Sequence, residues 1–244
     1  ARRHLLKAKA AIEAAKADEF GGVRPDASVY QLQLTALKND IHVLRSIQSQ
    51  EKRAEAKKEL IPKHMPYVLG IVQSGAKVEQ DEVITTIMLW CFDCGLFNQG
   101  LSLAEYALEQ NLKMPDSFSR STASIVAEEI GNAAHKAYQD GQIFKFDVLY
   151  KADQLTANHD MHDQIRAKLY LGLGRTLLQL EHGAEAVEFI KKAIAKNENC
   201  GGKTDLKKAE KLCKEQLKNS SEPMLNADGS QVVDDQGYLM FHPT

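Results

Sequence analysis

The sequence predicts an all-α fold: an N-terminal helical arm and long helix, a tetratricopeptide-like helical body, and a short irregular or hairpin C-terminal tail. Apolar residues recur at helical spacing over most of the 244 residues. Glycine and proline separate these stretches into segments of helix length, and no strand core is visible before residue 225. The chain is 43% hydrophobic and 26% charged, which suits one or two globular domains.

The N-terminal region contains a short basic helix and then a long one. The stretch Ser28–Gln31 has the pattern of a capping box that opens a helix. Good helix formers extend this helix to about residue 58, and its second half lacks an apolar stripe, so it is expected to project into solvent or meet a charged partner. Its first half carries an apolar seam at heptad positions a and d, which either joins two copies of the chain or packs on its own domain. The seam residues are Tyr30, Leu34, Leu37, Ile41 and Leu44.

Pro62 and Pro66 mark the passage into the helical body. Within it, Gly95 ends one helix, Asn98 is expected to cap the next, and Pro115 stops that helix. Small residues at helical spacing let neighbouring helices approach closely, as in repeat-like helical hairpins. The predicted helices of the body span 67–74, 80–94, 98–111, 122–139, 145–156, 162–180, 184–197 and 203–218.

Charge is distributed unevenly along the chain, and this pattern supports three regions. Residues 1–63 carry 13 Lys and Arg against 8 Asp and Glu, whereas residues 64–150 carry 5 against 11. A basic final helix closes the body at residue 218, and the acidic tail 219–244 contains short apolar runs that predict a hairpin. We therefore predict a basic DNA-binding and oligomerisation region over 1–63, a helical body over 64–218, and a separate tail over 219–244.

Two clusters of basic residues in the N-terminal region are candidate DNA contacts, because Lys and Arg bind phosphates without needing sequence information. The alternative for either cluster is an ordinary solvated helix face. The final basic helix, from Lys203 to Lys218, is expected to matter less, because it also carries acids and borders the acidic tail. The candidate DNA-binding residues are Arg2, Arg3, Lys7, Lys9, Lys16, Lys52, Arg53, Lys57 and Lys58.

The sequence offers no clear catalytic or metal site, and we expect no cofactor. Cys91 and Cys94 form a C-x-x-C pair within a helical pattern, which favours two core residues over a zinc or redox site. Asp160 and Asp163 are better explained as the start of a helix than as metal ligands, and Glu128 and its neighbour as a solvated helix face. The chain lacks a glycine-rich phosphate loop, so ATP hydrolysis is not expected.

The chain also contains no run of about 18 apolar residues, so no membrane-spanning helix is expected. Its basic N-terminus lacks the apolar core of a signal peptide. The expected location is therefore the cytoplasm.

The stretch Gln80–Pro115 resembles the small subunit of the terminase that packages DNA into tailed phage heads, in the form found in temperate phages with cohesive-end DNA. The resemblance covers roughly residues 1–218. It extends upstream through Lys57–Pro62 and downstream to Arg166–Leu169. Within the stretch it is carried by Gln80, Asp81, Met88, Leu89, Trp90, Asp93, Gly95, Gly100, Ala104, Tyr106, Ala107, Leu108, Leu112, Met114 and Pro115.

This resemblance implies a protein that binds double-stranded phage DNA at the packaging site and assembles with a large ATPase and nuclease subunit, in the host cytoplasm. Such subunits are conventionally called endonuclease subunits, although no nuclease site is visible in this sequence. The seam and the resemblance together favour a homo-oligomer. The competing hypothesis is a helical adaptor that binds protein partners only, and a third makes the chain itself a nuclease.

Overall fold

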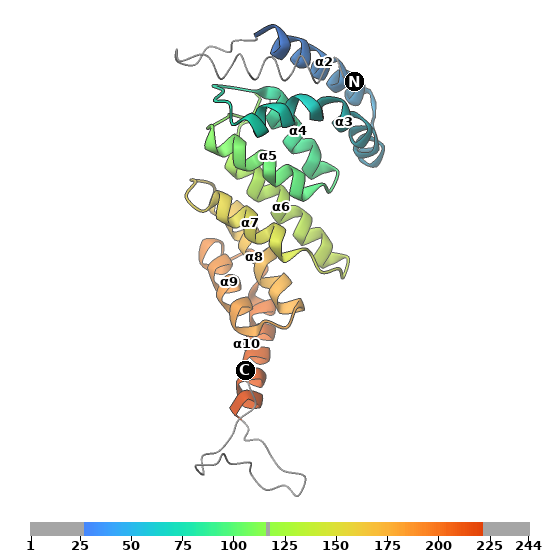
Figure 1. Cartoon of the computed structure of the whole chain (residues 1–244). Coiled ribbons are helices and arrows are strands. Elements are labelled where there is room, and N and C mark those ends of the chain that lie inside the picture. Colours follow the sequence, from blue (N-terminus) through green and yellow to red (C-terminus); the bar gives the residue numbers. More distant parts are fainter. Residues whose placement is uncertain (1–26, 116–117, 222–244) are drawn as a thin grey trace, which may run out of the picture. The chain divides into compact units, whose positions relative to one another are not determined.

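A computed structural model of the chain describes residues 27–115 and 118–221. In this part of the chain the regular secondary structure is all helical, with no strand, which confirms the predicted all-α class. Figure 1 shows the helices in chain order. Their bounds are α2 Ala27–Ser46, α3 Gln50–Ser74, α4 Glu82–Asp93, α5 Phe97–Glu109, α6 Thr122–Gln139, α7 Phe146–Thr156, α8 Asp163–Gln179, α9 Gly183–Lys196 and α10 Lys203–Ser221.

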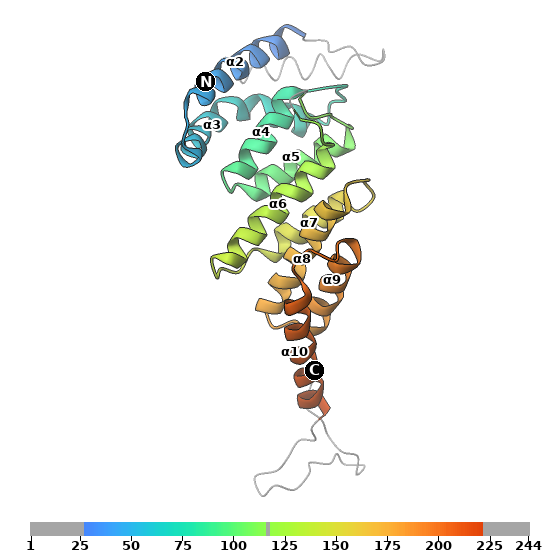
Figure 2. The same cartoon turned by 180° about the vertical axis from the view of Figure 1, so that it is seen from behind.

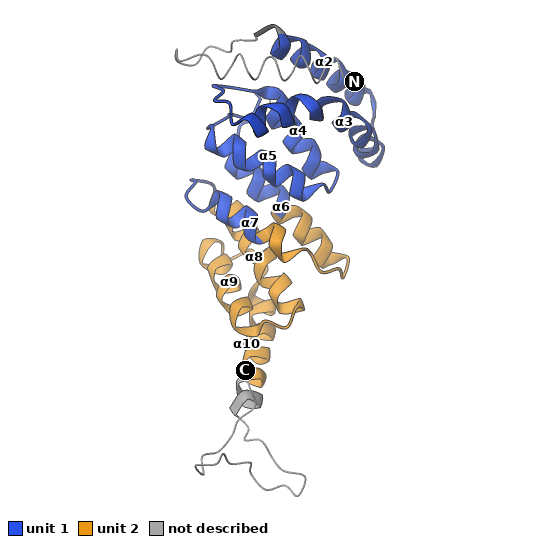
Figure 3. Cartoon of the chain, in the orientation of Figure 1, with its two compact units in different colours: residues 1–130, 150–162 blue, residues 131–149, 163–244 orange. Residues whose placement is uncertain are grey.

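The helices form two compact units (Figure 3). Unit 1 comprises residues 1–130 and 150–162, and unit 2 comprises residues 131–149 and 163–244. The predicted boundary at residue 63 falls inside α3, so the division into regions 1–63, 64–218 and 219–244 stays a prediction. The hairpin predicted for the tail lies outside the described residues.

The long helix predicted to run to about residue 58 is in fact two helices. α2 ends at Ser46, and α3 begins at Gln50 after Ser49, whose side chain accepts a hydrogen bond from the Lys52 amide at 3.3 Å. The Arg53 guanidinium binds the Ile47 carbonyl oxygen at 2.6 Å, which satisfies an acceptor left free by the break. A serine cap and one basic side chain thus stabilise the turn between two segments of good helix formers.

The passage predicted at Pro62 and Pro66 is not a helix boundary, because both prolines lie inside α3, which continues to Ser74. The separate helix expected over 67–74 is therefore the last part of α3. Each proline lacks an amide donor and disfavours a helix interior. Burial of Ile61, His64, Tyr67 and Val68 along this stretch favours the continuous helix, which ends at Gly75 with a left-handed φ of 63°.

The core of unit 1 is built around α4, which packs against α3 and α5; α4 and α5 lie side by side in both views (Figures 1 and 2). Asp81 caps α4: its Oδ1 accepts from the Val83 and Ile84 amides at 2.9 and 3.1 Å, and its Oδ2 accepts from the Tyr67 hydroxyl at 2.9 Å. One buried carboxylate therefore starts α4 and ties it to α3. Asn98 does not cap α5, since this helix begins one residue earlier and Leu96 at its cap position makes no side-chain cap bond.

Unit 2 contains α8, α9 and α10, with α9 in contact with both of the others. Gly174 lets α8 and α9 approach closely, because a Cβ at this position would lie 3.0 Å from the Ile190 amide nitrogen. The buried apolar residues of this packing are Leu171, Leu177, Ala186, Ile190, Ala193 and Ala209. Within the described part of the chain, no helix is long and apolar enough to cross a membrane.

Candidate nucleic-acid interface

The first predicted basic cluster, Arg2, Arg3, Lys7, Lys9 and Lys16, lies outside the described residues. Its role in DNA binding stays a prediction.

The second predicted basic cluster lies on the first half of α3, and its four side chains have two different environments. Arg53 is half-buried at the Ile47 carbonyl, and the Lys57 ammonium forms an ion pair with Asp93 at 2.5 Å. Lys52 and Lys58 are exposed. Only these two therefore present their charge to solvent, and Arg53 and Lys57 stabilise unit 1.

The predicted seam on α2 faces the rest of unit 1. Leu37 and Leu44 are buried, with 1% and 4% of their surface exposed, and Tyr30, Leu34 and Ile41 are half-buried. α2 packs against α3 and α4, so the two leucines are buried within a single chain. This placement corresponds to the second of the two predicted roles, packing on the seam's own domain.

A buried polar network that sequence spacing alone did not reveal joins α2 to α3. Asp40 accepts hydrogen bonds from the Lys63 ammonium at 2.8 Å and contacts His64 Nε2 at 2.8 Å. The His64 ring is fully buried and meets Trp90 edge-on, with ring centroids 6.2 Å apart. Burial alone would raise the pKa of Asp40, but the hydrogen bonds and positive charges of Lys63 and His64 outweigh it, and the pKa lies below its usual value.

The two cysteines of the C-x-x-C pair lie on α4 and at its C-terminal cap. Burial, with a smaller effect of Cys94, raises the pKa of the Cys91 thiol to about 12. Burial and the charge of Asp93 also raise the pKa of Cys94, whose sulfur lies 3.3 Å from the Ala54 carbonyl oxygen. A raised pKa disfavours the thiolate that metal binding and redox chemistry require.

Two of the carboxylates singled out in the sequence have structural partners, and Asp160 is exposed. Asp163 is the first residue of α8 and forms an ion pair with Lys196 at 2.9 Å. Glu128 forms an ion pair with Arg120. In the described ranges, no group of three or more His, Cys, Asp or Glu side chains is arranged to hold a metal ion.

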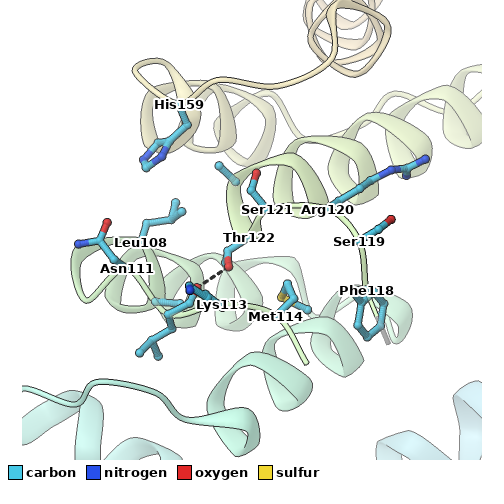
Figure 4. A pocket seen from close by; sticks show the side chains of 13 residues that line it. Leu108, Asn111, Lys113, Met114, Phe118, Ser119, Arg120, Ser121, Thr122 and His159 are labelled. Atoms are coloured by element: carbon cyan, nitrogen blue, oxygen red, sulfur yellow. Dashed lines mark hydrogen bonds between the residues drawn. The ribbon is translucent and has the colours of Figure 1, made fainter. Parts of the chain in front are cut away.

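A surface cavity of about 460 Å³ lies in unit 1 beside the start of α6 (Figure 4). Thr122 closes one side of it by donating a hydrogen bond to the Leu112 carbonyl oxygen at 2.5 Å. Arg120 points away along α6, consistent with its ion pair to Glu128. None of the described residues that line the cavity carries a carboxylate.

A second polar network, in unit 2, centres on Arg175 of α8. Its Nε donates to Asp205 at 2.8 Å, and its guanidinium lies 4.4 Å above the Tyr138 ring, whose hydroxyl also donates to Asp205 at 2.9 Å. Arg175 Nη1 lies 3.0 Å from Nδ1 of His135. Burial, together with the charges of Arg175 and Lys168, lowers the pKa of His135, so its neutral ring accepts this bond.

Comparison with known proteins identifies the family to which these helices belong. The family model for phage small terminase subunits matches residues 34–164, and the chain belongs to this family. The chain is 33% identical over 227 residues to the terminase, endonuclease subunit, of Escherichia phage P2, covering 93% of this chain and 89% of that protein. It is 30% identical over 146 residues to a probable terminase, endonuclease subunit, of Haemophilus phage HP1, covering 59% of this chain and 50% of that protein.

No solved structure matches this chain. The family confirms the resemblance seen in the sequence and supports a role in phage DNA packaging.

Proposed function

We propose that this chain binds double-stranded phage DNA at the packaging site and assembles with a large terminase subunit, which supplies the ATPase motor and cuts the cohesive ends. Membership of the small terminase subunit family is the observation that carries this proposal. The chain would act in the host cytoplasm, as a homo-oligomer.

The charge distribution supports the DNA-binding part of the proposal. Residues 1–63 hold 13 Lys and Arg against 8 Asp and Glu, and the exposed Lys52 and Lys58 belong to this region. The side chains of Arg53 and Lys57 are already engaged within unit 1. We therefore assign the larger share of the N-terminal contacts to Arg2, Arg3, Lys7 and Lys9, with Lys52 and Lys58 adding to them.

We assign the cutting chemistry to the large subunit. The relatives are named endonuclease subunits, but Asp163 and Glu128 of this chain are each held in an ion pair with a basic side chain. A two-metal nuclease needs several carboxylates that converge on the ions. The two carboxylates instead stabilise the beginning of α8 and the surface of α6.

A mobility-shift experiment with the purified chain tests the proposal against the adaptor hypothesis. The chain is titrated into a packaging-site duplex and into a random duplex of equal length, each at low and at moderate salt, on the order of 50 and 200 mM, the interval over which phosphate contacts weaken strongly. Tighter binding to the packaging-site duplex is the expected result. If neither duplex is bound at the lower salt concentration, the chain is a protein-binding adaptor.

A further inference from the structure

The final helix of unit 2, α10, has two opposite faces of different chemistry. One face carries Ala209, which is fully buried, and the half-buried Leu206, Leu212 and Cys213, and it packs on α9 and α8. The other face carries lysines spaced by four, four and three residues. Because an α-helix has 3.6 residues per turn, these lysines lie in one row along the helix axis: Lys203, Lys207, Lys211 and Lys214. We call these four residues the lysine row.

Two polar anchors fix the rotation of α10 about its axis. Near its start, Asp205 is buried and binds Arg175 and Tyr138 at 2.8 and 2.9 Å. Three turns later, the Gln216 side chain accepts from the Gly183 amide at 3.3 Å and donates to the Glu181 carbonyl oxygen at 2.5 Å. Asp205 and Gln216 are 11 residues apart and share one face, so the anchors hold the lysine row on the opposite face.

The acids near the lysine row neutralise it only in part. Asp205 is directed inward to Arg175, and Glu210 forms an ion pair at 3.6 Å with Lys191 of α9. Lys203 and Lys211 form exposed ion pairs with Glu198 and Glu215, which contribute little because water screens them. Within the described part of the chain, Lys207, Lys208 and Lys214 form no ion pair.

The expectation that this helix matters less for DNA rested on the acids of the helix and on the acidic tail that follows it. The first of these two reasons is weakened. The structure shows that Asp205 and Glu210 are engaged by Arg175 and by a lysine of another helix.

We propose that the lysine row of α10 is a second binding site, which holds the phosphate backbone of double-stranded DNA without reading its sequence. The row extends about 16 Å from Lys203 to Lys214, at 1.5 Å per residue, so it spans more than one phosphate of a strand. It presents ammonium groups without an exposed apolar side chain among them. A protein partner of comparable area would need apolar contacts at its centre, whereas a phosphate backbone needs only charge.

That the bound polyanion is DNA rests on the proposed packaging function. The geometry of the lysine row is independent of that function. The side chains of the lysine row stand on a helix that is anchored at two points. A pre-positioned row loses less conformational freedom on binding than lysines on an unanchored segment.

The test compares three full-length variants in the mobility-shift experiment with a random duplex. The first is Lys207→Gln with Lys211→Gln and Lys214→Gln. The second is a control with the same change of charge in the same unit, at lysines that do not contact the acids of α10: Lys136→Gln, Lys192→Gln and Lys196→Gln. The third removes charge at the N-terminus: Arg2→Gln, Arg3→Gln, Lys7→Gln and Lys9→Gln. Circular dichroism confirms that each variant is folded.

The α10 variant is expected to bind about tenfold or more weakly at low salt, and its plot of log affinity against log salt should flatten by about 0.9 for each phosphate that is no longer bound. The control variant should stay within about twofold of the parent chain, since it removes three surface charges that do not form part of the lysine row. Equal decreases in both variants would show a general charge effect and overturn the proposal.

Three further outcomes separate this inference from the proposed function. If the α10 variant binds like the parent and the N-terminal variant does not, the lysine row is not a DNA site and the proposed function stands. If the parent chain binds no duplex at low salt, the DNA-binding function itself fails. If the α10 variant keeps its DNA affinity but no longer associates with the large subunit, the row binds protein, which also overturns the proposal.

Discussion

At the scale of single residues, Asp40 of unit 1 is a buried carboxylate that contacts Lys63 and the buried His64. Its lowered pKa means that folding favours the ionised form. The stability that it contributes is fully present above the ordinary pKa of 3.8 and is lost as the pH falls through the lower value of the folded state. The network is thus intact at neutral pH and weakens only in strong acid.

Asp40→Asn should lower the free energy of unfolding by about 2 kcal/mol at pH 7, because it removes a charged acceptor from a buried histidine. Urea titration of both proteins at neutral pH and at a pH of about 3.5 measures the effect, and the difference should be smaller at the lower pH. Lys63→Gln is the control: its side chain is 54% exposed, and it should cost less than about 1 kcal/mol. A difference that grows towards acid pH would contradict this account.

At the scale of helices, α2 offers a direct comparison of its inner and outer sides. Leu37 is 1% exposed and Leu32 is 70% exposed on the same helix. Leu37→Asp should destabilise unit 1 by several kcal/mol, since it places an unpaired charge among buried apolar groups. Leu32→Asp should change the stability by less than about 0.5 kcal/mol. Chemical denaturation measures both, and equal effects would show that the seam is not buried within the chain.

Self-association is a separate question for the same helix. Multi-angle light scattering of the parent chain across a range of concentrations should show an oligomer. A constant monomer mass would leave the seam with its intrachain role alone.

The anchors of α10 lead to another prediction for an element. Asp205→Asn keeps the size of the side chain but removes the charge that binds Arg175 and Tyr138. Amide hydrogen exchange in α10 should become faster, because the first turn of the helix is then held to α8 without a charge-assisted hydrogen bond. Gln216→Ala should act mainly on the last turns. Unchanged exchange in both variants would show that apolar packing alone positions the helix.

Helix limits were predictable where local chemistry decides them. The predicted range 122–139 coincides with α6, because breakers bound that segment on both sides. The break between α2 and α3 was missed, since good helix formers surround it. The hydrogen bond from Arg53 to the Ile47 carbonyl oxygen that stabilises the break is not evident from the sequence pattern. Pro62 and Pro66 were misleading for the opposite reason, because burial around them outweighs their local preference.

The candidate interface was predictable only in part. Composition identified Lys52, Arg53, Lys57 and Lys58 as basic, but not that Asp93 pairs with Lys57. The lysines of α10 were also visible in the sequence. The pairing of the acids on the same helix was not visible, since it depends on which residues of other helices lie beside them. Asp205 pairs with Arg175, and Glu210 pairs with Lys191 of α9.

At the scale of the whole chain, we predict that the isolated protein does not cut DNA. Incubation with linear duplex in magnesium or manganese should leave the substrate intact. Cleavage that disappears in Asp160→Ala or Asp163→Ala would establish a nuclease site in this chain. Cleavage that survives both changes would have to be separated from a contaminant by repurification of the active fraction.

The two basic sites also predict how the whole chain holds DNA. If the N-terminal residues and the lysine row contact the same duplex, neutralising both sets should flatten the salt dependence by the sum of the two separate changes, since each bound phosphate releases its own counterions. If they hold two different duplexes, each site keeps its own affinity. Removing one site should then halve the number of duplexes bound and leave the slope of the other unchanged.

Stoichiometric titration at low salt, followed by salt titration of the parent, the two single-site variants and the combined variant, distinguishes these cases. We expect the slopes to add, because a subunit that delivers a concatemer benefits from binding one molecule at two sites, which raises the effective concentration of DNA at the second site. A combined variant no weaker than the N-terminal variant would leave residues 1–63 as the DNA-binding region and remove the lysine row from the mechanism.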